Sequence, residues 1–351
     1  MKKTKVLFIC GSPNQTTMMH KIAKEMKDAD CFFTPYYAHG YVGFLAKHGM
    51  LDYTILGGEF RKRIFQYIKT HNLSLDLHGK NGGYDIVFTG SDLIVPKNIR
   101  SYKIVLVQEG MTDPENFAYY LVKYLRFPRW LSTGSTGLSH LYDLFCVASE
   151  NYKELFISKG INPDKLVVTG IPNFDNCAEF KNNDFPHKNY VLAATSDMRE
   201  TYKYEDRKKF IKKAVEIASG RQLIFKLHPN EKVKRASAEI NKYAPGAIVI
   251  DNVNAEILIA NCDTLVTRYS SVVYVGLALG KEVFSDFDVN DLKKLIPIQN
   301  AGTSAKNIAD CAMALLYQEK RYDVEENSGD LNFKTTFWNK HSIKRKLAKI
   351  K

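Results

Sequence analysis

Short apolar runs alternate with longer amphipathic segments along most of the chain. Runs of four to eight apolar residues bounded by polar or turn residues are typical of parallel strands buried on both faces. The first half has six such runs, at residues 5–10, 31–35, 84–89, 103–108, 144–148 and 165–169. Helical patterns begin near Met18, at Phe60 and after Ser149. This alternation predicts a doubly wound parallel α/β sheet.

The same alternation starts again after a polar stretch at residues 181–188 that contains a proline. A polar segment of this kind is typical of a linker between domains. Five further strands are predicted, at residues 190–194, 222–227, 247–250, 263–267 and 281–284. Helices are predicted at residues 206–218, 255–260 and 272–279, and Gly280 supplies a helix stop. We therefore expect two Rossmann-like domains, residues 1–180 and 181–325, that face each other across a cleft, followed by a basic tail at 326–351.

Composition narrows the possible partners. The 351 residues carry a formal net charge of +12, which indicates an anionic partner. No zinc-finger spacing or RRM signature is present, so nucleic acid is not the expected partner. The six cysteines are scattered and form no CxxC pair, so neither a disulfide framework nor a zinc site is indicated. The apolar run at residues 6–10 is shorter than a signal-peptide core, and we expect a first strand and a cytoplasmic protein.

Two turns of the first domain follow buried strands. Gly11 and Ser12 come after the first strand, and Glu109 and Gly110 come directly after the fourth. Ligands of parallel sheets bind at this edge, and a carboxylate there can act as a general base if burial raises its pKa. A plain βα turn at Gly11 and a solvated loop acid at Glu109 are the alternatives. We group Asn173, in the turn after the sixth strand, with Gly11, Ser12 and Gly110 as expected acceptor-side residues.

Three polar turns of the second domain also follow strands, at residues 195–199, 228–231 and 268–271. Strands of one parallel sheet end at the same edge, so we expect these turns to lie together. Arginine, histidine and hydroxyl groups suit a pyrophosphate or phosphodiester. The alternatives are a structural His228 and an ordinary helix cap at Ser270. The predicted donor-binding residues are Ser196, Arg199, His228, Glu231, Arg268, Ser270 and Ser271.

Two segments combine basic and aromatic residues. Residues 117–130, FAYYLVKYLRFPRW, suit an interface with lipid headgroups or a lipid-linked acceptor, or else a core helix whose Lys and Arg stems cover apolar surface. Residues 331–351 contain seven basic residues and no acidic one. We expect residues 333–338 to pack on the protein and residues 343–351 to face an anionic membrane.

Four segments together resemble a known superfamily. They are SENYKELFISKGINPDKLVVTGIPNFD, VLAATSDMRE, FKLHPNE and CDTLVTRYSSVVYVGLALGKEVF, within residues 103–287. They are similar to segments of the CDP-glycerol glycerophosphotransferase-like and UDP-GlcNAc 2-epimerase-like proteins. The resemblance implies the GT-B fold, donor-phosphate contacts from Arg199, His228, Ser270 and Ser271, and a catalytic acid or base at Glu109.

The chain also departs from these patterns. Glu109 stands where the glycerophosphotransferases have a histidine before glycine, and Arg268 stands where they have an aspartate before Tyr-Ser-Ser. The SGGxxEE-like segment of the epimerases is absent. These departures disfavour hydrolytic or epimerase chemistry, place CDP-glycerol in question as donor, and favour a sugar donor instead.

The expected function is that of a metal-independent GT-B glycosyltransferase with Glu109 and His228 as catalytic residues. It would move a sugar or polyol-phosphate from a nucleotide-sugar or a CDP- or CMP-linked donor to a surface polysaccharide or lipid-linked acceptor. Transfer in the GT-B class needs no bound metal, so neither a metal nor a cofactor is expected. A UDP-GlcNAc 2-epimerase-like isomerase and a non-catalytic nucleotide-sugar-binding protein are the alternatives. The enzyme would work in the cytoplasm, with peripheral attachment to the inner membrane face open.

Overall fold

A computed structural model of the chain describes residues 3–327, with side chains to Tyr317. By its internal contacts the chain divides into two compact units, residues 1–312 and 313–351. Both predicted sheets lie in the first unit. No helix within the described residues is both long and apolar enough to cross a membrane. The predictions for residues 331–351 concern a segment outside the described residues.

The first sheet confirms the predicted parallel α/β arrangement. Its six strands pair in parallel in the order β2-β1-β3-β4-β5-β6. They are β1 (Thr4–Cys10), β2 (Ala29–Pro35), β3 (Ile86–Thr89), β4 (Lys103–Val107), β5 (Leu144–Val147) and β6 (Leu166–Val168). Strands β3 and β5 are buried along their whole length, as continuous apolar runs require. The side chains of Phe33, Phe8 and Phe88 stack on one another across β2, β1 and β3.

The helices associated with the first sheet are α1 (Pro13–Glu25), α2 (Gly40–Lys47), α3 (Gly58–Thr70), α4 (Phe117–Leu125) and α5 (Glu150–Ser158). Helix α1 begins at Pro13, five residues before the start expected near Met18. Ser12 is its N-cap and Pro13 occupies the first turn, where a missing N–H costs nothing. The segment at residues 117–130 is helical only to Leu125, because Arg126 takes a left-handed conformation and Pro128 follows.

The second sheet has five parallel strands in the order β11-β10-β7-β8-β9. They are β7 (Val191–Ala194), β8 (Leu223–Lys226), β9 (Ile248–Ile250), β10 (Thr264–Val266) and β11 (Glu282–Phe284). The remaining helices are α6 (Arg207–Ala218), α7 (Val233–Tyr243), α8 (Ala255–Asn261), α9 (Val272–Ala278), α10 (Val289–Lys294) and α11 (Ser304–Asn327). The first strand of this sheet is central, as in a Rossmann fold.

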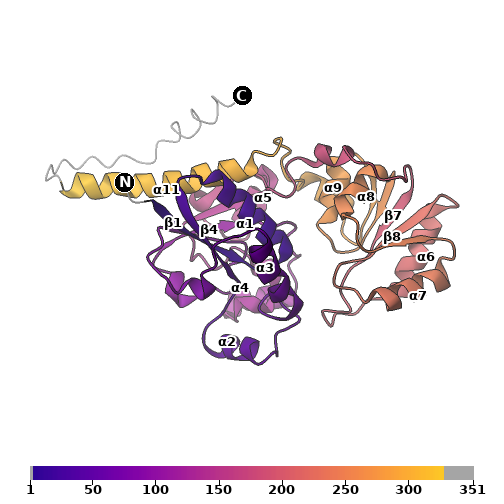
Figure 1. The fold of residues 1–351 in the computed structure, drawn as a ribbon, viewed down its shortest axis with the longest axis horizontal. Helices are drawn as coiled ribbons and strands as arrows, with labels where there is room; N and C mark the ends of the chain where they lie inside the picture. The colour runs from indigo at the N-terminus through magenta and orange to yellow at the C-terminus, as the bar shows by residue number, and fades with distance from the viewer. Residues whose placement is uncertain (1–2, 328–351) are drawn as a thin grey trace. The chain divides into compact units, whose positions relative to one another are not determined.

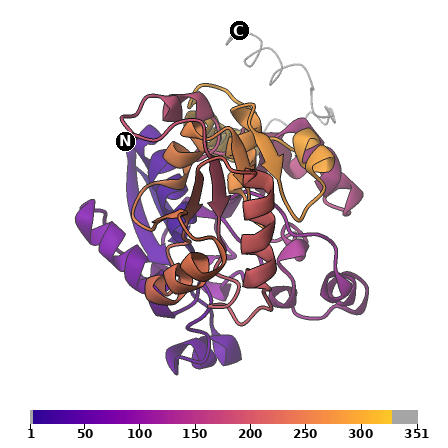
Figure 2. The ribbon, with the colours of Figure 1, turned by 90° about the vertical axis from the view of Figure 1, so that its right-hand side faces the viewer.

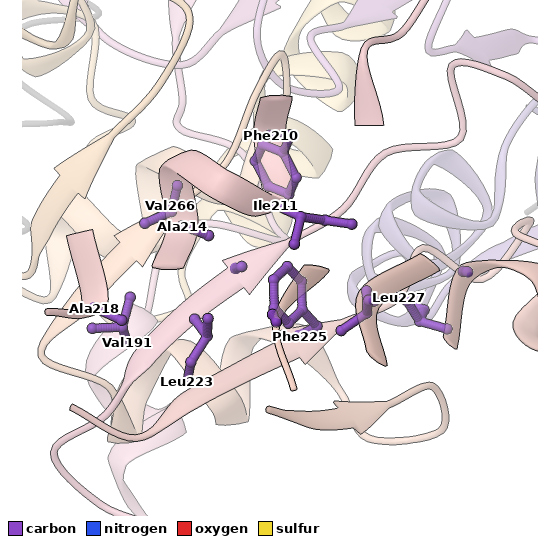
Figure 3. Close-up of a cluster of buried hydrophobic side chains, with 13 residues drawn as sticks. Val191, Phe210, Ile211, Ala214, Ala218, Leu223, Phe225, Leu227 and Val266 are labelled. Atoms are coloured by element: carbon purple, nitrogen blue, oxygen red, sulfur yellow. The ribbon is translucent and has the colours of Figure 1, made fainter. Parts of the chain in front are cut away.

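Helices cover both faces of the second sheet. Figure 1 shows α6 and α7 on one side of β7 and β8, and α8 and α9 on the other. Figure 2 brings α6 and α7 to the front of the sheet. Their apolar faces enclose a core whose centre is Phe225, Phe210 and Ile211 (Figure 3). At roughly 1.5–3 kcal/mol for each large apolar side chain, this burial is the main stabilising contribution to the domain.

Candidate functional site

The strand orders decide where a ligand would bind. Neighbouring connections run in opposite directions from β1 and β3 in the first sheet, and from β7 and β10 in the second. In open parallel sheets the crevice at such a switch point, outside the carboxyl ends of the strands, is the usual ligand site. The turns that contain Ser12, Ser196 and Ser270 follow β1, β7 and β10. The predicted residues therefore lie at the two switch points or beside them.

Glu109 forms the centre of a hydrogen-bonded group in the first sheet. The Ser12 hydroxyl donates to Glu109 Oε1 at 2.5 Å, and the Gln15 side-chain amide donates to Glu109 Oε2 at 2.6 Å. Ser12 Oγ also accepts from the Gln15 backbone N–H at 3.0 Å and so caps α1. The N-terminus of α1 thus fixes the carboxylate that follows β4.

Two glycines make room for Gln15. A Cβ on Gly90, which follows β3, would lie 2.8 Å from Gln15 Cδ. The backbone N–H of Gly11 donates to Gln15 Oε1 at 3.0 Å. Since β3 lies between β1 and β4, Gln15 reaches Glu109 only by crossing the end of β3. The absence of a side chain at Gly90 permits that crossing.

Burial raises the pKa of the Glu109 carboxyl, and the hydrogen bonds from Ser12 and Gln15 partly oppose this rise. Burial disfavours the charged form, whereas two donors favour it. A carboxylate with a raised pKa takes up a proton more readily at neutral pH than an ordinary glutamate does. Glu109 therefore has the protonation chemistry of a general base or acid.

The turn after β8 fixes His228 in one neutral tautomer. Its backbone N–H donates to Thr195 Oγ1 at 3.0 Å and to Glu231 Oε2 at 2.9 Å. Its Nδ1 lies 3.2 Å from the backbone N–H of Asn230, which can only donate. Nδ1 therefore accepts, and the proton of the neutral ring is on Nε2. Burial lowers the pKa of His228, although Asp197 and Glu231 act in the opposite direction.

The two predicted arginines are held by carboxylates. Arg199 Nη1 donates to Glu239 at 2.8 Å, and its Nε lies 3.4 Å from Glu205 Oε2. Arg268 Nε donates to Asp286 at 2.6 Å. Both arginines thus contribute less free positive charge to the turns than their sequence positions suggest.

Each of these arginines nevertheless keeps an unused donor. Arg199 Nη2 and Arg268 Nη1 are buried and make no hydrogen bond within the described part of the chain. Glu231 Oε1 lies 4.0 Å from Arg199 Nη2, and Glu205 Oε1 lies 4.0 Å from Arg268 Nη1. Buried donors without a partner are costly, so an anionic oxygen from a ligand would be a favourable partner for them.

Glu231 and Ser196 point into the protein. The Glu231 carboxylate accepts from Arg207 at 2.6 Å and contacts the Thr195 hydroxyl. The Ser196 hydroxyl donates to Glu205 at 3.1 Å. The side chains of Glu231 and Ser196, both predicted to bind the donor, thus make internal hydrogen bonds that hold the turns after β7 and β8 together.

The turn after β10 differs in detail from the expected capping arrangement. Ser271, not Ser270, is the N-cap of α9, and its side chain makes no capping hydrogen bond. Ser270 Oγ accepts weakly from the Val272 N–H at 3.4 Å. A Cβ on Gly110 would lie 2.9 Å from Ser271 Oγ, so the residue after Glu109 is packed against this turn.

Asn173 and Arg63 hold two of the site's turns in place. Asn173 donates to the Asn14 carbonyl at 2.9 Å and to Thr17 Oγ1 at 3.1 Å, and so supports the first turns of α1. Arg63 of α3 donates to Asn230 Oδ1 at 2.8 Å and to the Pro229 carbonyl at 3.0 Å. The turn that positions His228 is therefore held from both sheets. Among the side chains that the structure describes, no group of His, Cys, Asp and Glu could hold a metal ion.

Sequence reasoning missed several residues of the site. Gln15 had a detectable signal, because Ser12 and Gln15 have the S-x-x-Q spacing of a capping box at a helix start. Gly90 follows a strand, as do many structural glycines. Glu205 and Arg207 lie in a charged stretch that is typical of a solvated helix start, yet both are buried. No local pattern distinguishes them.

No protein-family model and no curated protein sequence matches the chain. Several solved structures are similar to it in fold. A putative UDP-N-acetylglucosamine 2-epimerase from Listeria monocytogenes is 16% identical, with 92% of this chain and 90% of that chain covered and a TM-score of 0.55. The UDP-GlcNAc 2-epimerase from Neisseria meningitidis, bound to UDP-GlcNAc, is 14% identical, with coverage of 89% and 100% and a TM-score of 0.54.

A variant of the wall teichoic acid polymerase TagF soaked with CDPG is 13% identical, with 91% of this chain and 90% of that chain covered and a TM-score of 0.51. Identities this low establish the fold alone. The chain has the GT-B fold of two parallel α/β sheet domains that the UDP-GlcNAc 2-epimerases and the teichoic acid polymerase TagF share.

Proposed function

We propose that the protein is a glycosyltransferase that takes its sugar from a nucleotide-activated donor. The observation that carries the proposal is the position of Glu109. Its carboxyl has a raised pKa and is fixed by Ser12 and Gln15. The next residue in the sequence, Gly110, packs against the Ser271 turn of the second sheet. A base on one sheet and hydroxyl and guanidinium donors on the other suit transfer between an acceptor and a phosphate leaving group.

The chemistry follows from these groups. Glu109 takes the proton of the acceptor hydroxyl as the acceptor oxygen bonds to the anomeric carbon of the donor sugar. The bond between that carbon and the donor phosphate oxygen breaks, and its electron pair leaves with the nucleotide. His228 donates from Nε2 to the phosphate, since its Nδ1 accepts from Asn230. The unused donors Arg199 Nη2 and Arg268 Nη1 supply further stabilisation of the developing charge.

Neutral His228 suits this role. Its lowered pKa means that the ring donates one hydrogen bond without depending on a proton from solvent at neutral pH. The carboxylates Glu205, Glu231 and Glu239 pair with Arg199 and Arg207 and fix the guanidinium groups, so what the site offers an anion is oriented N–H donors and not a net positive charge. A polyol-phosphate donor would use the same groups, with phosphorus as the atom attacked.

A second candidate is an epimerase. A partly buried carboxyl with a raised pKa, such as that of Glu109, can also remove a proton from carbon, and the fold neighbours include a UDP-GlcNAc 2-epimerase bound to UDP-GlcNAc. Incubation with UDP-GlcNAc in the absence of an acceptor separates the two reactions, because only an isomerase converts the sugar. Proton exchange with deuterated solvent at the sugar would identify the isomerase directly.

The test of the proposed function begins with ligand binding. A thermal-shift screen with UDP, CDP, CMP, GDP and their sugars should find a nucleotide that raises the melting temperature, because a ligand specific to the folded state stabilises it. Glu109→Gln should retain that shift and lose turnover by about 10²–10⁴-fold. Glu154→Gln, at an exposed position on α5, is the charge-matched control. Turnover of Glu109→Gln within a few-fold of wild type would reject the mechanism, and binding without turnover of any donor would indicate a non-catalytic nucleotide-binding protein.

A further inference from the structure

A cavity in the first sheet domain is lined by basic residues that the proposed reaction does not use. It has a volume of about 490 Å³ and lies between the end of α4 and the end of α5. Its charged lining consists of Lys123, Arg126, Arg129 and Lys159, with His140 beside them, and no carboxylate lines it.

Lys159 is a buried cationic side chain that the surrounding protein holds in place in the cavity wall. Its side chain is only 3% exposed, and its ammonium donates to the Gly134 carbonyl at 3.3 Å and lies 5.4 Å from the centre of the Tyr119 ring. Burial lowers the pKa of Lys159. A lysine is rarely buried without a carboxylate partner, so a charged lysine in a cavity wall suits an anionic ligand.

The local charges that oppose an anion are fewer than those that favour it. Asp113 and Glu115 act on Lys159 electrostatically and each carries one negative charge, but neither of them lines the cavity. The ends of α4 and α5 add about half a negative charge each. The four cationic side chains exceed this sum, and three of them, Lys123, Arg126 and Arg129, are more exposed than Lys159 and form the rim.

The surface around the cavity is apolar and aromatic. Phe117 is 78% exposed and Tyr124 is 68% exposed, although both belong to a helix. Exposed large apolar side chains on α4 and the segment that follows it are Phe117, Tyr120, Tyr124, Leu125, Phe127, Trp130 and Leu131. Aromatic side chains next to Lys and Arg are typical of surfaces that lie at the headgroup level of a membrane.

Helix α2 adds a second apolar surface. None of its side chains is buried, although most of its residues are apolar, and Tyr41 and Phe44 are among the exposed ones. Figure 1 shows α2 and α4 toward the same end of the first sheet.

We propose that the α4 surface docks on an anionic phospholipid membrane and that the cavity at its C-terminal end binds the phosphate of a lipid headgroup. Lys123, Arg126 and Arg129 contact the phosphate from the rim and Lys159 from the floor. The α4 aromatic side chains enter the interface between headgroups and acyl chains. This inference is independent of the proposed reaction, because vesicle binding requires no turnover.

The test uses the full chain and two pairs of substitutions. Flotation with phosphatidylcholine vesicles in which one lipid in four is phosphatidylglycerol measures binding. Lys123→Gln with Arg126→Asn removes two rim charges, and asparagine tolerates the left-handed backbone at Arg126. Since each basic residue near an anionic surface contributes about fivefold in affinity, the pair should weaken binding by about 25-fold. Phe117→Ser with Tyr124→Ser should also weaken vesicle binding.

The controls separate specific docking from general charge attraction. Lys212→Gln with Lys213→Gln removes the same charge from exposed positions of α6 and should leave binding close to wild type. Equal loss in this control, or no vesicle binding by wild type, would overturn the proposal. Inorganic pyrophosphate serves as the soluble probe. If pyrophosphate binds the wild type, binds the Lys123→Gln/Arg126→Asn pair more weakly, and the wild type does not float with vesicles, the cavity belongs to a soluble phosphate ligand, and that result would also reject the membrane proposal.

Discussion

The hydroxyl of Ser12 donates a 2.5 Å hydrogen bond to the carboxylate of Glu109. The two residues are 97 positions apart and follow different strands, β1 and β4. Ser12 also caps α1, so the start of the first helix and the proposed base form one unit. A substitution in the first turn of α1 should therefore change the pKa of Glu109.

Gln15→Met should raise the pKa of Glu109. The Gln15 amide donates to the carboxylate and lowers its pKa, and methionine has a similar length without the donor. If Glu109 must be ionised to act, activity increases with pH through its pKa, and the acidic limb of the pH–rate profile should move to higher pH. The limb should stay in place in Glu154→Gln. An unchanged acidic limb in Gln15→Met would show that Gln15 does not set the pKa of the group on which activity depends.

Glu109→Gln should become more stable relative to the wild type as the pH rises from acid to neutral. The folded state raises the pKa of Glu109, so it holds a proton that the unfolded chain has already released above about pH 4.3. Stability of the wild type therefore falls as pH rises through this window, while the glutamine variant has no such dependence. The difference in melting temperature, variant minus wild type, should grow from acid to neutral pH. A constant difference would contradict the raised pKa.

His228→Asn and His228→Gln should distinguish the role of Nδ1 from the role of Nε2. Asparagine can place an acceptor near the position of Nδ1 and retain the bond from Asn230 N–H, whereas glutamine can place a donor near Nε2. If Nε2 donates to the donor phosphate, the glutamine variant should keep more activity and the asparagine variant more thermal stability. His228→Ala should lose activity and keep the fold. Activity per folded molecule that remains at the wild-type level in His228→Ala would make this histidine structural.

Arg207→Met should strongly destabilise the second domain. Arg207 donates to Glu231 at 2.6 Å and to Glu205 at 2.9 Å, and both carboxylate side chains are fully buried. Removal of one partner of a buried ion pair leaves an uncompensated charge and typically costs about 3–5 kcal/mol. Urea unfolding measures the loss. Lys208→Met, on the exposed side of α6, is the matched control and should cost much less.

The sequence predicted the fold well because the strands are continuous apolar runs. Each of the predicted strands is present, and most boundaries move by only one or two residues, as in the strand expected at residues 263–267 and found at Thr264–Val266. The start of α1 was missed because Ser12, Pro13 and Asn14 are also typical loop residues. The run at Gln15 lacks the apolar periodicity on which the prediction of a start near Met18 depended.

The site was less accessible to prediction than the fold. That three turns meet at one edge follows from parallel pairing, which is a property of the topology. Which of their side chains face a ligand depends on partners that are distant in sequence, such as Arg207 for Glu231 and Asp286 for Arg268. The roles of the predicted site residues remain predictions that the experiments above address.

A buried pair of tyrosines offers a test of the packing between α5 and α9. The hydroxyls of Tyr152 and Tyr274 lie 2.5 Å apart. Burial raises the pKa of Tyr152 to about 12, and its hydroxyl also interacts with Gln108 and the backbone at Thr112. Tyr274 is likewise buried, but its pKa is affected only by burial and by Tyr152.

This asymmetry predicts unequal costs. Tyr152→Phe leaves the Tyr274 hydroxyl buried without its partner and should cost about 1–3 kcal/mol of unfolding free energy. Tyr274→Phe leaves Tyr152 with its other contacts and should cost less. The double phenylalanine variant should be more stable than the sum of the single variants implies, since no hydroxyl of the pair then remains unpaired. Equal single costs that simply add would show that the two hydroxyls do not depend on each other.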